Sequence, residues 1–218
     1  MIGYKYYFFL KIEALDRVQV VIVTDIFGRT SMVDRMADCL KKQLVEVVVL
    51  DPYGGIKNDF VDETVAYAEF ISLCGHDPYA ALVQQKIADL KGPLLLIGFS
   101  AGATAIWRCL DGAIARKIQH FVGFYPGQIR NHLCLIPLCP STLIFPSEEK
   151  HFSVGEVMEA LKRKEKVHCH QVSALHGFMN DLSPQYSKDV ADEFYGLLGS
   201  VELSSHPDFF KNISTVKS

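Results

Sequence analysis

A serine between two glycines, at a point where an apolar strand turns into a helix, is the feature of this sequence most directly tied to chemistry. Gly98-Phe99-Ser100-Ala101-Gly102 follows the apolar run 92–97 and leads into the helix-forming run 103–107. A tight strand-to-helix turn lifts a serine hydroxyl clear of the sheet, and the glycines leave room for neighbouring backbone. Free N–H groups at the start of the helix favour an oxyanion. The pattern predicts that Ser100 is the nucleophile of an acyl-transfer reaction.

The strand-to-helix turn at 98–102 is called the serine elbow below. A serine hydroxyl is a weak nucleophile unless a base removes its proton, so this elbow predicts a histidine further along the chain. His176 lies in the segment 174–178, just after a strand that we expect to end at Val172. A loop in that position can reach over the edge of the sheet to Ser100. His176 is therefore the predicted base.

The histidine in turn needs an acid, expected between the nucleophile and the base in chain order. Glu148 and Glu149 follow an apolar run at 142–145 that reads as a strand. We favour Glu149, because its offset from the end of the strand is the usual one for such an acid. Glu148 remains the alternative, and a pair of solvated carboxylates with no role in catalysis is the third interpretation.

Short β-branched runs alternate with segments of helical periodicity along the whole chain, which predicts a doubly wound, mostly parallel α/β sheet with helices on both faces. We expect strands at 6–10, 18–24, 45–50, 92–97, 119–124, 142–145 and 167–172, helices at 31–44, 62–73, 78–90, 103–107, 154–164 and 187–198, and a proline-rich loop at 126–140. Nothing divides the chain, so residues 1–218 are expected to form a single domain. Ligands of such sheets bind at the carboxyl ends of the strands.

The charge balance argues against a nucleic-acid partner. The 218 residues carry 22 Lys and Arg against 25 Asp and Glu, a net charge of −3, and no long basic run is present. The apolar stretch 6–10 is too short for a membrane span or a signal peptide, so we expect no membrane partner and a cytoplasmic location. The six cysteines lie mostly in apolar segments, as expected for free thiols in a reducing compartment.

Two further clusters invite a functional interpretation. His168-Cys169-His170 places two imidazoles on one face of an expected strand, but no further ligands stand nearby, so partly buried strand histidines are favoured over a metal site and no metal or cofactor is expected. His76-Asp77-Pro78 reads as a helix start with Asp77 as its cap.

Several motifs at expected strand ends occur together in one order. They are Asp25-Ile26-Phe27-Gly28, Asp51-Pro52-Tyr53-Gly54-Gly55, the serine elbow, Gly123-Phe124-Tyr125-Pro126-Gly127 and His176-Gly177-Phe178. Together they resemble the dienelactone hydrolase family of small α/β hydrolases. The resemblance implies a single-domain α/β-hydrolase fold.

The resemblance also implies further site residues. The second oxyanion N–H would come from Ile26, beside that of Ala101. Asp25 occupies the place of a family glutamate close to the nucleophile, and its alternative interpretation is a cap for the helix that begins near Ser31. Phe27, Tyr53 and Tyr125 would line the substrate pocket, in which case an apolar or aromatic substrate is expected. Together with Asp25, these three residues form the expected substrate-binding set.

The sequence departs from the best known members of that family in ways that bear on substrate. Those members use a cysteine nucleophile with an aspartate, and they bind a substrate carboxylate with arginines, one of them shortly after the histidine. Here Ser100 is the nucleophile, Glu149 is the favoured acid, and Phe178-Met179-Asn180-Asp181 follows His176. The chain is therefore expected to be a broader esterase than a dienelactone specialist.

The predicted function is cleavage of a small-molecule carboxylic ester or lactone through an acyl-enzyme intermediate, by a monomer or small homo-oligomer. Two alternatives stay open from the sequence. One is a non-catalytic binding protein with the same fold, and the other is a thioesterase or acyl transferase that uses the same triad.

Overall fold

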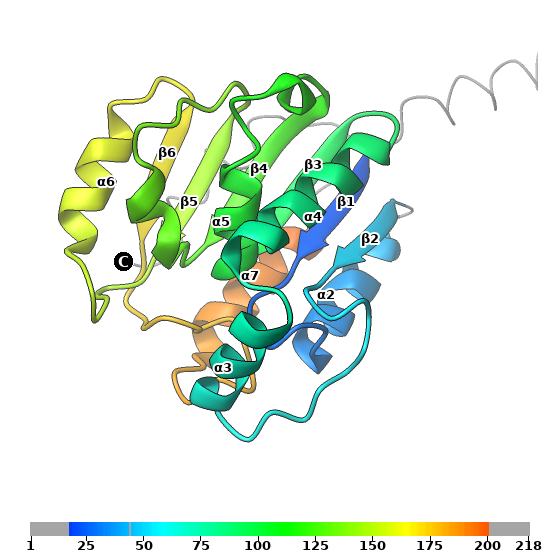
Figure 1. Ribbon diagram of the computed structural model, residues 1–218, viewed down its shortest axis with the longest axis vertical. Helices are drawn as coiled ribbons and strands as arrows, with labels where there is room; N and C mark the ends of the chain where they lie inside the picture. The colour runs from blue at the N-terminus through cyan, green and yellow to red at the C-terminus, as the bar shows by residue number, and fades with distance from the viewer. Residues whose placement is uncertain (1–17, 44, 201–218) are drawn as a thin grey trace, which may run out of the picture.

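Six parallel strands form the centre of the protein, in the order β2-β1-β3-β4-β5-β6 (Figure 1). The computed structural model describes residues 18–43 and 45–200, and the edge strand expected at 6–10 lies outside this part of the chain. The strands are β1 Gln19–Val23, β2 Glu46–Leu50, β3 Leu94–Phe99, β4 Ile118–Phe124, β5 Ser141–Phe145 and β6 Val167–Gln171. Their parallel pairing confirms the predicted class of sheet.

Helices cover both faces of this sheet, as Figure 1 shows. On one face lie α2 (Ser31–Lys41) and α7 (Lys188–Ser200); on the other lie α3 (Glu63–Leu73), α4 (His76–Asp89), α5 (Ala101–Trp107) and α6 (Val154–Lys162). Two short 3₁₀ helices, η1 (Ala113–Lys117) and η2 (Gly127–His132), flank β4. The layering is that of a doubly wound α/β domain.

The two faces of the sheet belong to two separate apolar clusters. Leu94 and Leu96 of β3 pack with Trp107 on the α5 side, whereas Leu95 and Ile97 belong to the cluster that contains α2 and α7. All six residues of β3 are buried, as expected for a central parallel strand covered on both faces. The sheet is therefore a rigid base for the loops that follow its strands.

The helix boundaries differ from the sequence expectation by one to three residues at several ends. The helix expected at 31–44 ends at Lys41. The helix expected from residue 78 begins at His76, with Gly75 as its N-cap, so the prediction that Asp77 caps it is wrong. Pro78 falls in the first turn, where a proline is tolerated because a backbone N–H there has no helical acceptor.

The loop expected between residues 126 and 140 contains η2, which begins three residues after β4 ends at Phe124. In the part of the chain that the structure describes, no helix is long and apolar enough to cross a membrane. The loops that follow β1, β3, β4, β5 and β6 all leave the same edge of the sheet, because the strands are parallel. That edge carries the candidate site.

Candidate active site

Ser100 occupies a strained turn between β3 and α5. Its backbone has φ 46° and ψ −109°, a conformation that residues other than glycine rarely adopt. Gly98 and Gly102 make the turn possible: a Cβ on Gly98 would lie 2.6 Å from the Ala103 Cα, and one on Gly102 would lie 2.2 Å from the Thr24 carbonyl oxygen. The two glycines of the elbow are therefore required by the close packing of backbone on each side.

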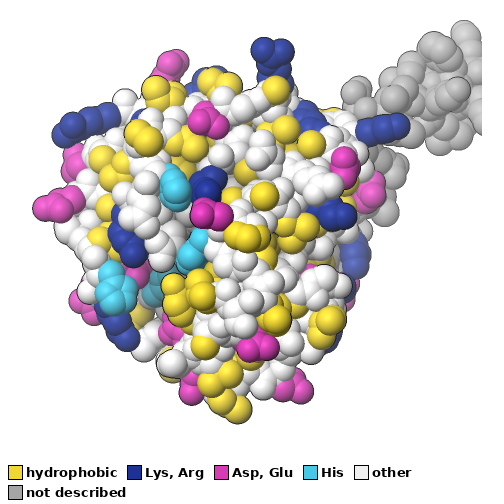
Figure 2. Space-filling model, in the orientation of Figure 1, with side chains coloured by type: hydrophobic (Ala, Val, Ile, Leu, Met, Phe, Trp, Pro, Cys, Tyr) yellow, Lys and Arg dark blue, Asp and Glu magenta, His cyan; other side chains and the backbone are white. Residues whose placement is uncertain are grey.

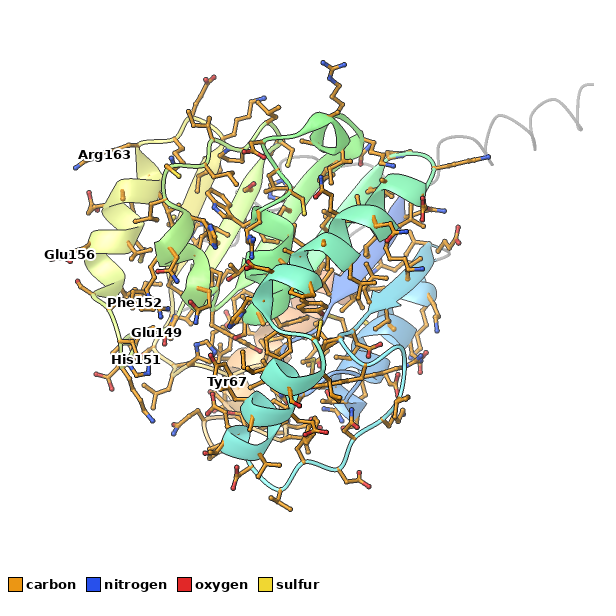
Figure 3. All side chains as sticks on the ribbon, in the orientation of Figure 1. Tyr67, Glu149, His151, Phe152, Glu156 and Arg163 are labelled. Carbon is orange, nitrogen blue, oxygen red and sulfur yellow. The ribbon has the colours of Figure 1, made fainter. Side chains whose placement is uncertain are left out.

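A chain of two hydrogen bonds leads from Ser100 to a carboxylate. The Oγ of Ser100 lies 3.0 Å from the Nε2 of His176, and the Nδ1 of His176 lies 2.6 Å from the Oε1 of Glu149. Figure 3 shows Glu149 on the loop between β5 and α6, whereas His176 comes from the loop after β6. The Glu149 side chain is 10% exposed, and its neighbour Glu148 is exposed to solvent. The structure thus brings Ser100, His176 and Glu149 together and leaves Glu148 outside.

The loops that carry the acid and the base are bonded to each other. Both the N–H and the hydroxyl of Ser147 donate to the Ala174 carbonyl, at 2.8 and 3.1 Å. The Gln171 amide donates to the carbonyls of Pro146 and Ser147. These bonds fix the position of Glu149 relative to His176, because Ser147 and Ala174 each lie two residues before one of them.

Tyr125 supports the histidine from behind. Its ring centroid lies 5.0 Å from that of His176, and it packs edge-on against Phe178. The side chain is completely buried and the residue has φ 38°. The expectation that Tyr125 contacts substrate is therefore corrected: the β4 end turns this side chain into the core, where it holds the His176 ring.

Two backbone N–H groups beside Ser100 are free to bind an oxyanion. Within the described residues, neither the N–H of Ile26 nor that of Ala101 has a hydrogen-bond acceptor. Ala101 begins α5, so its N–H has no acceptor in its own helix, and the adjacent Gly102 packs on the end of β1, which leads to Ile26. Both N–H groups are therefore available for the oxyanion-binding role that the resemblance implies.

The loop that carries Ile26 is held rigidly. Tyr53 donates its hydroxyl proton to the Ile26 carbonyl at 2.6 Å, and the N–H of Phe27 donates to Asp25 Oδ1 at 2.9 Å. The Phe27 and Tyr53 side chains are 5% and 9% exposed. Tyr53 lies under the loop and Phe27 is buried beside it, so both side chains support the loop in this structure, and their contact with substrate stays a prediction.

Asp25 joins the loop that carries Ile26, called the oxyanion loop, to the loop that carries His176, called the histidine loop. Its Oδ2 accepts a hydrogen bond from the Asn180 side-chain amide at 2.8 Å, while its Oδ1 accepts from Phe27. Burial raises the pKa of this carboxyl to about 6, against the opposing effect of the two hydrogen bonds. The interpretation of Asp25 as a helix cap is wrong, because the Thr30 hydroxyl caps α2.

Asn180 is the site residue that sequence reasoning missed. It is completely buried, and besides its bond to Asp25 it accepts one from the N–H of Leu182. A buried amide needs partners, and an asparagine directly after the apolar pair Phe178-Met179 was the available signal. Its partner lies 155 residues away, which no local pattern indicates.

Among the described residues, no group of three or more His, Cys, Asp or Glu side chains could hold a metal ion. On β6, His168 is exposed and His170 is half-buried, which fits the interpretation of strand histidines.

Comparison with known proteins identifies the fold. No protein-family model matches the chain. A Bacillus subtilis (strain 168) protein described as uncharacterized protein YczH is 27% identical over 202 residues, which span 91% of this chain and 90% of that protein.

Several solved structures superpose on most of the chain. The dienelactone hydrolase-like promiscuous phosphotriesterase P91 from metagenomic libraries has a TM-score of 0.61 at 14% identity, over 90% of this chain and 86% of its own. The thioesterase domain from the curacin biosynthetic pathway has a TM-score of 0.58 at 14% identity, over 84% of this chain and 91% of its own. Est1E from Butyrivibrio proteoclasticus, with ferulic acid bound, has a TM-score of 0.57 at 10% identity, over 85% of this chain and 88% of its own. The chain therefore has the α/β-hydrolase fold, as predicted.

The contact between α5 and β1 leads to a first prediction. Gly102→Ala places a methyl group against two backbone carbonyl oxygens, those of Thr24 at 2.2 Å and Val23 at 2.5 Å, and neither can rotate away. We expect the free energy of unfolding in urea to fall by at least about 3 kcal/mol.

The matched control is Gly196→Ala in α7. Gly196 is exposed inside a helix and a Cβ there meets nothing within 4 Å, so this change should stabilise the protein by about 0.5–1 kcal/mol. Equal effects of the two substitutions would contradict the packing described at the elbow.

Asp25 leads to a prediction on pH. The pKa of the Asp25 carboxyl is about 6 in the folded chain, whereas its ordinary value is 3.8. The folded chain therefore binds this proton more tightly than the unfolded chain. The contribution of Asp25 to stability is therefore largest below pH 4 and is lost as the pH rises through 6, a loss of up to about 3 kcal/mol.

The measurement compares urea unfolding of the wild type and Asp25→Asn at several values between pH 4 and pH 7. The other titrating groups are common to both proteins, so the difference isolates Asp25. The wild type should lose stability relative to the variant as the pH rises. A difference that is constant over this range would show that the carboxyl is not perturbed.

Proposed function

We propose that this protein is a serine hydrolase of the dienelactone hydrolase type, which cleaves a carboxylic ester or lactone through an acyl-enzyme intermediate. The observation that supports the proposal is the pair of hydrogen bonds that runs from the Ser100 Oγ through His176 to Glu149. A base within reach of the nucleophile, and an acid that orients the base, are the two contacts that acyl transfer needs.

Acylation begins when the Ser100 Oγ attacks the carbonyl carbon of the ester while His176 Nε2 takes the hydroxyl proton. The carbonyl oxygen becomes an oxyanion, which accepts hydrogen bonds from the N–H groups of Ile26 and Ala101. The bond between the carbonyl carbon and the alcohol oxygen then breaks, and His176 gives its proton to that oxygen. Glu149 stabilises the protonated imidazole throughout.

Deacylation repeats these steps with water. His176 removes a proton from a water molecule, which attacks the acyl carbon, and the same two N–H groups hold the second oxyanion. The bond to the Ser100 Oγ breaks and the serine recovers its proton from His176. The products are the free acid and the regenerated enzyme, and each step uses only groups of the chain and water.

Two observations favour an enzyme over a binding protein with the same fold. The positive φ of Ser100 is a strained conformation, and such strain concentrates at reacting groups. The carboxylate of Glu149 is nearly buried and directed at a ring nitrogen of His176, an arrangement that binding alone does not require. A thioester would pass through the same steps with a sulfur leaving group, so thioesters belong in the substrate panel.

Removing the nucleophile gives the first test of this function. Ser100→Ala should lower kcat/KM for small aryl esters by a factor on the order of 10⁶, because no other group can form the acyl-enzyme. A fluorophosphonate probe should label the wild type and leave the variant unlabelled. Ser72→Ala, at an exposed position of α3, is the control and should keep full activity and labelling. Retained turnover in Ser100→Ala would refute the proposal.

The acid is tested by two neighbouring substitutions. Glu149→Gln should lower kcat by a factor on the order of 10⁴, since an amide cannot stabilise the imidazolium and its N–H₂ group favours the wrong tautomer. Glu148→Gln changes an exposed side chain of the same type and should change kcat by less than about twofold. Equal losses in the two variants would remove Glu149 from the mechanism.

A further inference from the structure

Two successive residues of the histidine loop hold the two ends of the oxyanion loop. The Asn180 side-chain amide donates to Asp25 Oδ2, at the start of the oxyanion loop, at 2.8 Å. The Asp181 carboxylate accepts from the hydroxyl of Ser31, directly after the other end of that loop, at 2.6 Å. The loop with the base and the loop with the Ile26 N–H are therefore joined at two points.

The two contacts differ in their surroundings. Asp181 also pairs with Arg35 at 2.9 Å, and the Arg35 side chain is 53% exposed, so solvent weakens the contacts of this carboxylate. Asn180 and Asp25 are 0% and 6% exposed. Figure 2 shows acidic side chains that stand out from the surface of the molecule, and the enclosed Asp25 carboxylate is unlike them. Hydrogen bonds to a buried charge are the stronger kind, so the Asn180 contact is the one that fixes the two loops.

The position of Asn180 requires both a donor and an acceptor. Its Oδ1 accepts from the N–H of Leu182 at 3.0 Å, so its Nδ2 is the end that faces Asp25. An ionised aspartate at this position would have no donor for Asp25. An apolar residue of the same size would leave both the Leu182 N–H and the Asp25 carboxylate short of a partner.

Asp25 fixes the oxyanion donor through a turn. Its Oδ1 accepts from the N–H of Phe27 at 2.9 Å, and its carbonyl accepts from that of Gly28 at 3.1 Å. A bond from an aspartate side chain to the N–H two residues further on encloses the residue between them. That residue is Ile26, so a shift of the Asp25 carboxylate changes the direction of the Ile26 N–H.

The backbone of Asn180 is bonded next to the base. Its N–H donates to the Gly177 carbonyl at 2.8 Å, and Gly177 directly follows His176. Its own carbonyl accepts from the N–H of Ser183 at 2.9 Å. A Cβ on Gly177 would lie 2.6 Å from the Ser183 Oγ, so this loop is closely packed on itself. Movement of Asn180 therefore moves His176 as well.

We propose that Asn180 is a positioning residue of the hydrolysis: its bond to Asp25 sets the distance between the His176 base and the Ile26 donor, and this bond requires one amide and one carboxylate at the two positions. The inference rests on the proposed function, because it concerns the same reaction. The oxyanion and the protonated imidazole are present together in the transition state, so their partners must be correctly spaced.

The charges around Asp25 are known from the structure. Burial raises its pKa, a protonated His176 favours its carboxylate, and Glu63 at the start of α3 opposes it. Three nearby tyrosines have a raised pKa, chiefly because they are buried, with the Asp25 charge as a further cause: Tyr53, Tyr79 and Tyr125. These rings stay neutral, so His176 and Glu63 are the charges that must be kept constant, and variants at positions 25 and 180 leave both in place.

Exchange of the two groups is the test. In the double variant Asp25→Asn/Asn180→Asp, the amide at position 25 donates to the carboxylate at position 180, which also accepts from the Leu182 N–H, so every hydrogen bond of the wild type has a counterpart. Each single variant breaks the match. Asp25→Asn places two amides together, and one N–H is left without an acceptor. Asn180→Asp places two carboxylates together.

The first measurement is kcat for 4-nitrophenyl butanoate at about pH 8, expressed per site that reacts with the fluorophosphonate probe. We expect each single variant to lose a factor on the order of 100, and the double variant to return to within about threefold of the wild type. KM should change by less than about threefold, because the loss falls on the transition state. A purely structural role would lower the number of reactive sites and leave kcat per site unchanged.

The pH dependence of Asn180→Asp is the second measurement. Two carboxylates in contact share a proton, which restores the bond at low pH and is lost at high pH. The ratio of kcat in this variant to that of the wild type should therefore fall by about tenfold or more between about pH 5.5 and pH 8.5. The titration of the base is common to both proteins and cancels. Asn131→Asp, at an exposed position of η2, is the matched control, and its ratio should stay constant.

The outcomes distinguish this role from the proposed function. Full kcat per site in both single variants would overturn the role of Asn180 and keep the hydrolase. A double variant as slow as the single variants would overturn the requirement for one amide and one carboxylate. A folded wild type that neither hydrolyses the ester nor reacts with the probe would refute the hydrolase, and this role with it.

Discussion

The close approach of α5 to the end of β1 is the contact on which the rest of the site depends. Gly102 lies so near the carbonyl oxygens of Val23 and Thr24 that any side chain would separate the helix from the strand. Because the two elements touch, the N–H of Ala101 and the loop that carries Ile26 come to lie on the same side of Ser100. The strain at Ser100 is a consequence, and it persists because the Ser100 N–H is bonded to the Phe124 carbonyl at 2.9 Å.

The histidine loop is held from two sides by contacts of different kinds. On the β5 side, Ser147 joins the acid loop to Ala174 through backbone and hydroxyl hydrogen bonds. On the β1 side, the Asp25 carboxylate accepts from Asn180, so one buried group links the oxyanion loop to the base. Burial opposes the charge on Asp25 and the two hydrogen bonds favour it. The geometry of the base is thus coupled to that of the oxyanion hole through a titratable group.

The parts of this architecture that could be predicted from the sequence are those with local causes. The elbow is one, because two glycines and a helix start suffice to define it, and the offset of Glu149 from a strand end is another. Asn180 could not be placed, since its partner is 155 residues distant and nothing near it in the chain indicates Asp25. A similar limit applies to the start of α4, which lies at His76, directly after Gly75. Periodicity alone set that start two residues too late, at Pro78.

The aromatic residues illustrate a more general limit. Phe27, Tyr53 and Tyr125 follow strand ends, where ligands bind, and that position suggested an aromatic pocket. In the folded chain their rings are buried beneath the loops: Tyr53 bonds the Ile26 carbonyl, and Tyr125 packs on His176. Position at a strand end does not distinguish a side chain that faces a ligand from one that supports the loop. With these rings packed beneath the loops, they hold the base and the Ile26 loop in place, and their position at strand ends is explained without any contact to a ligand.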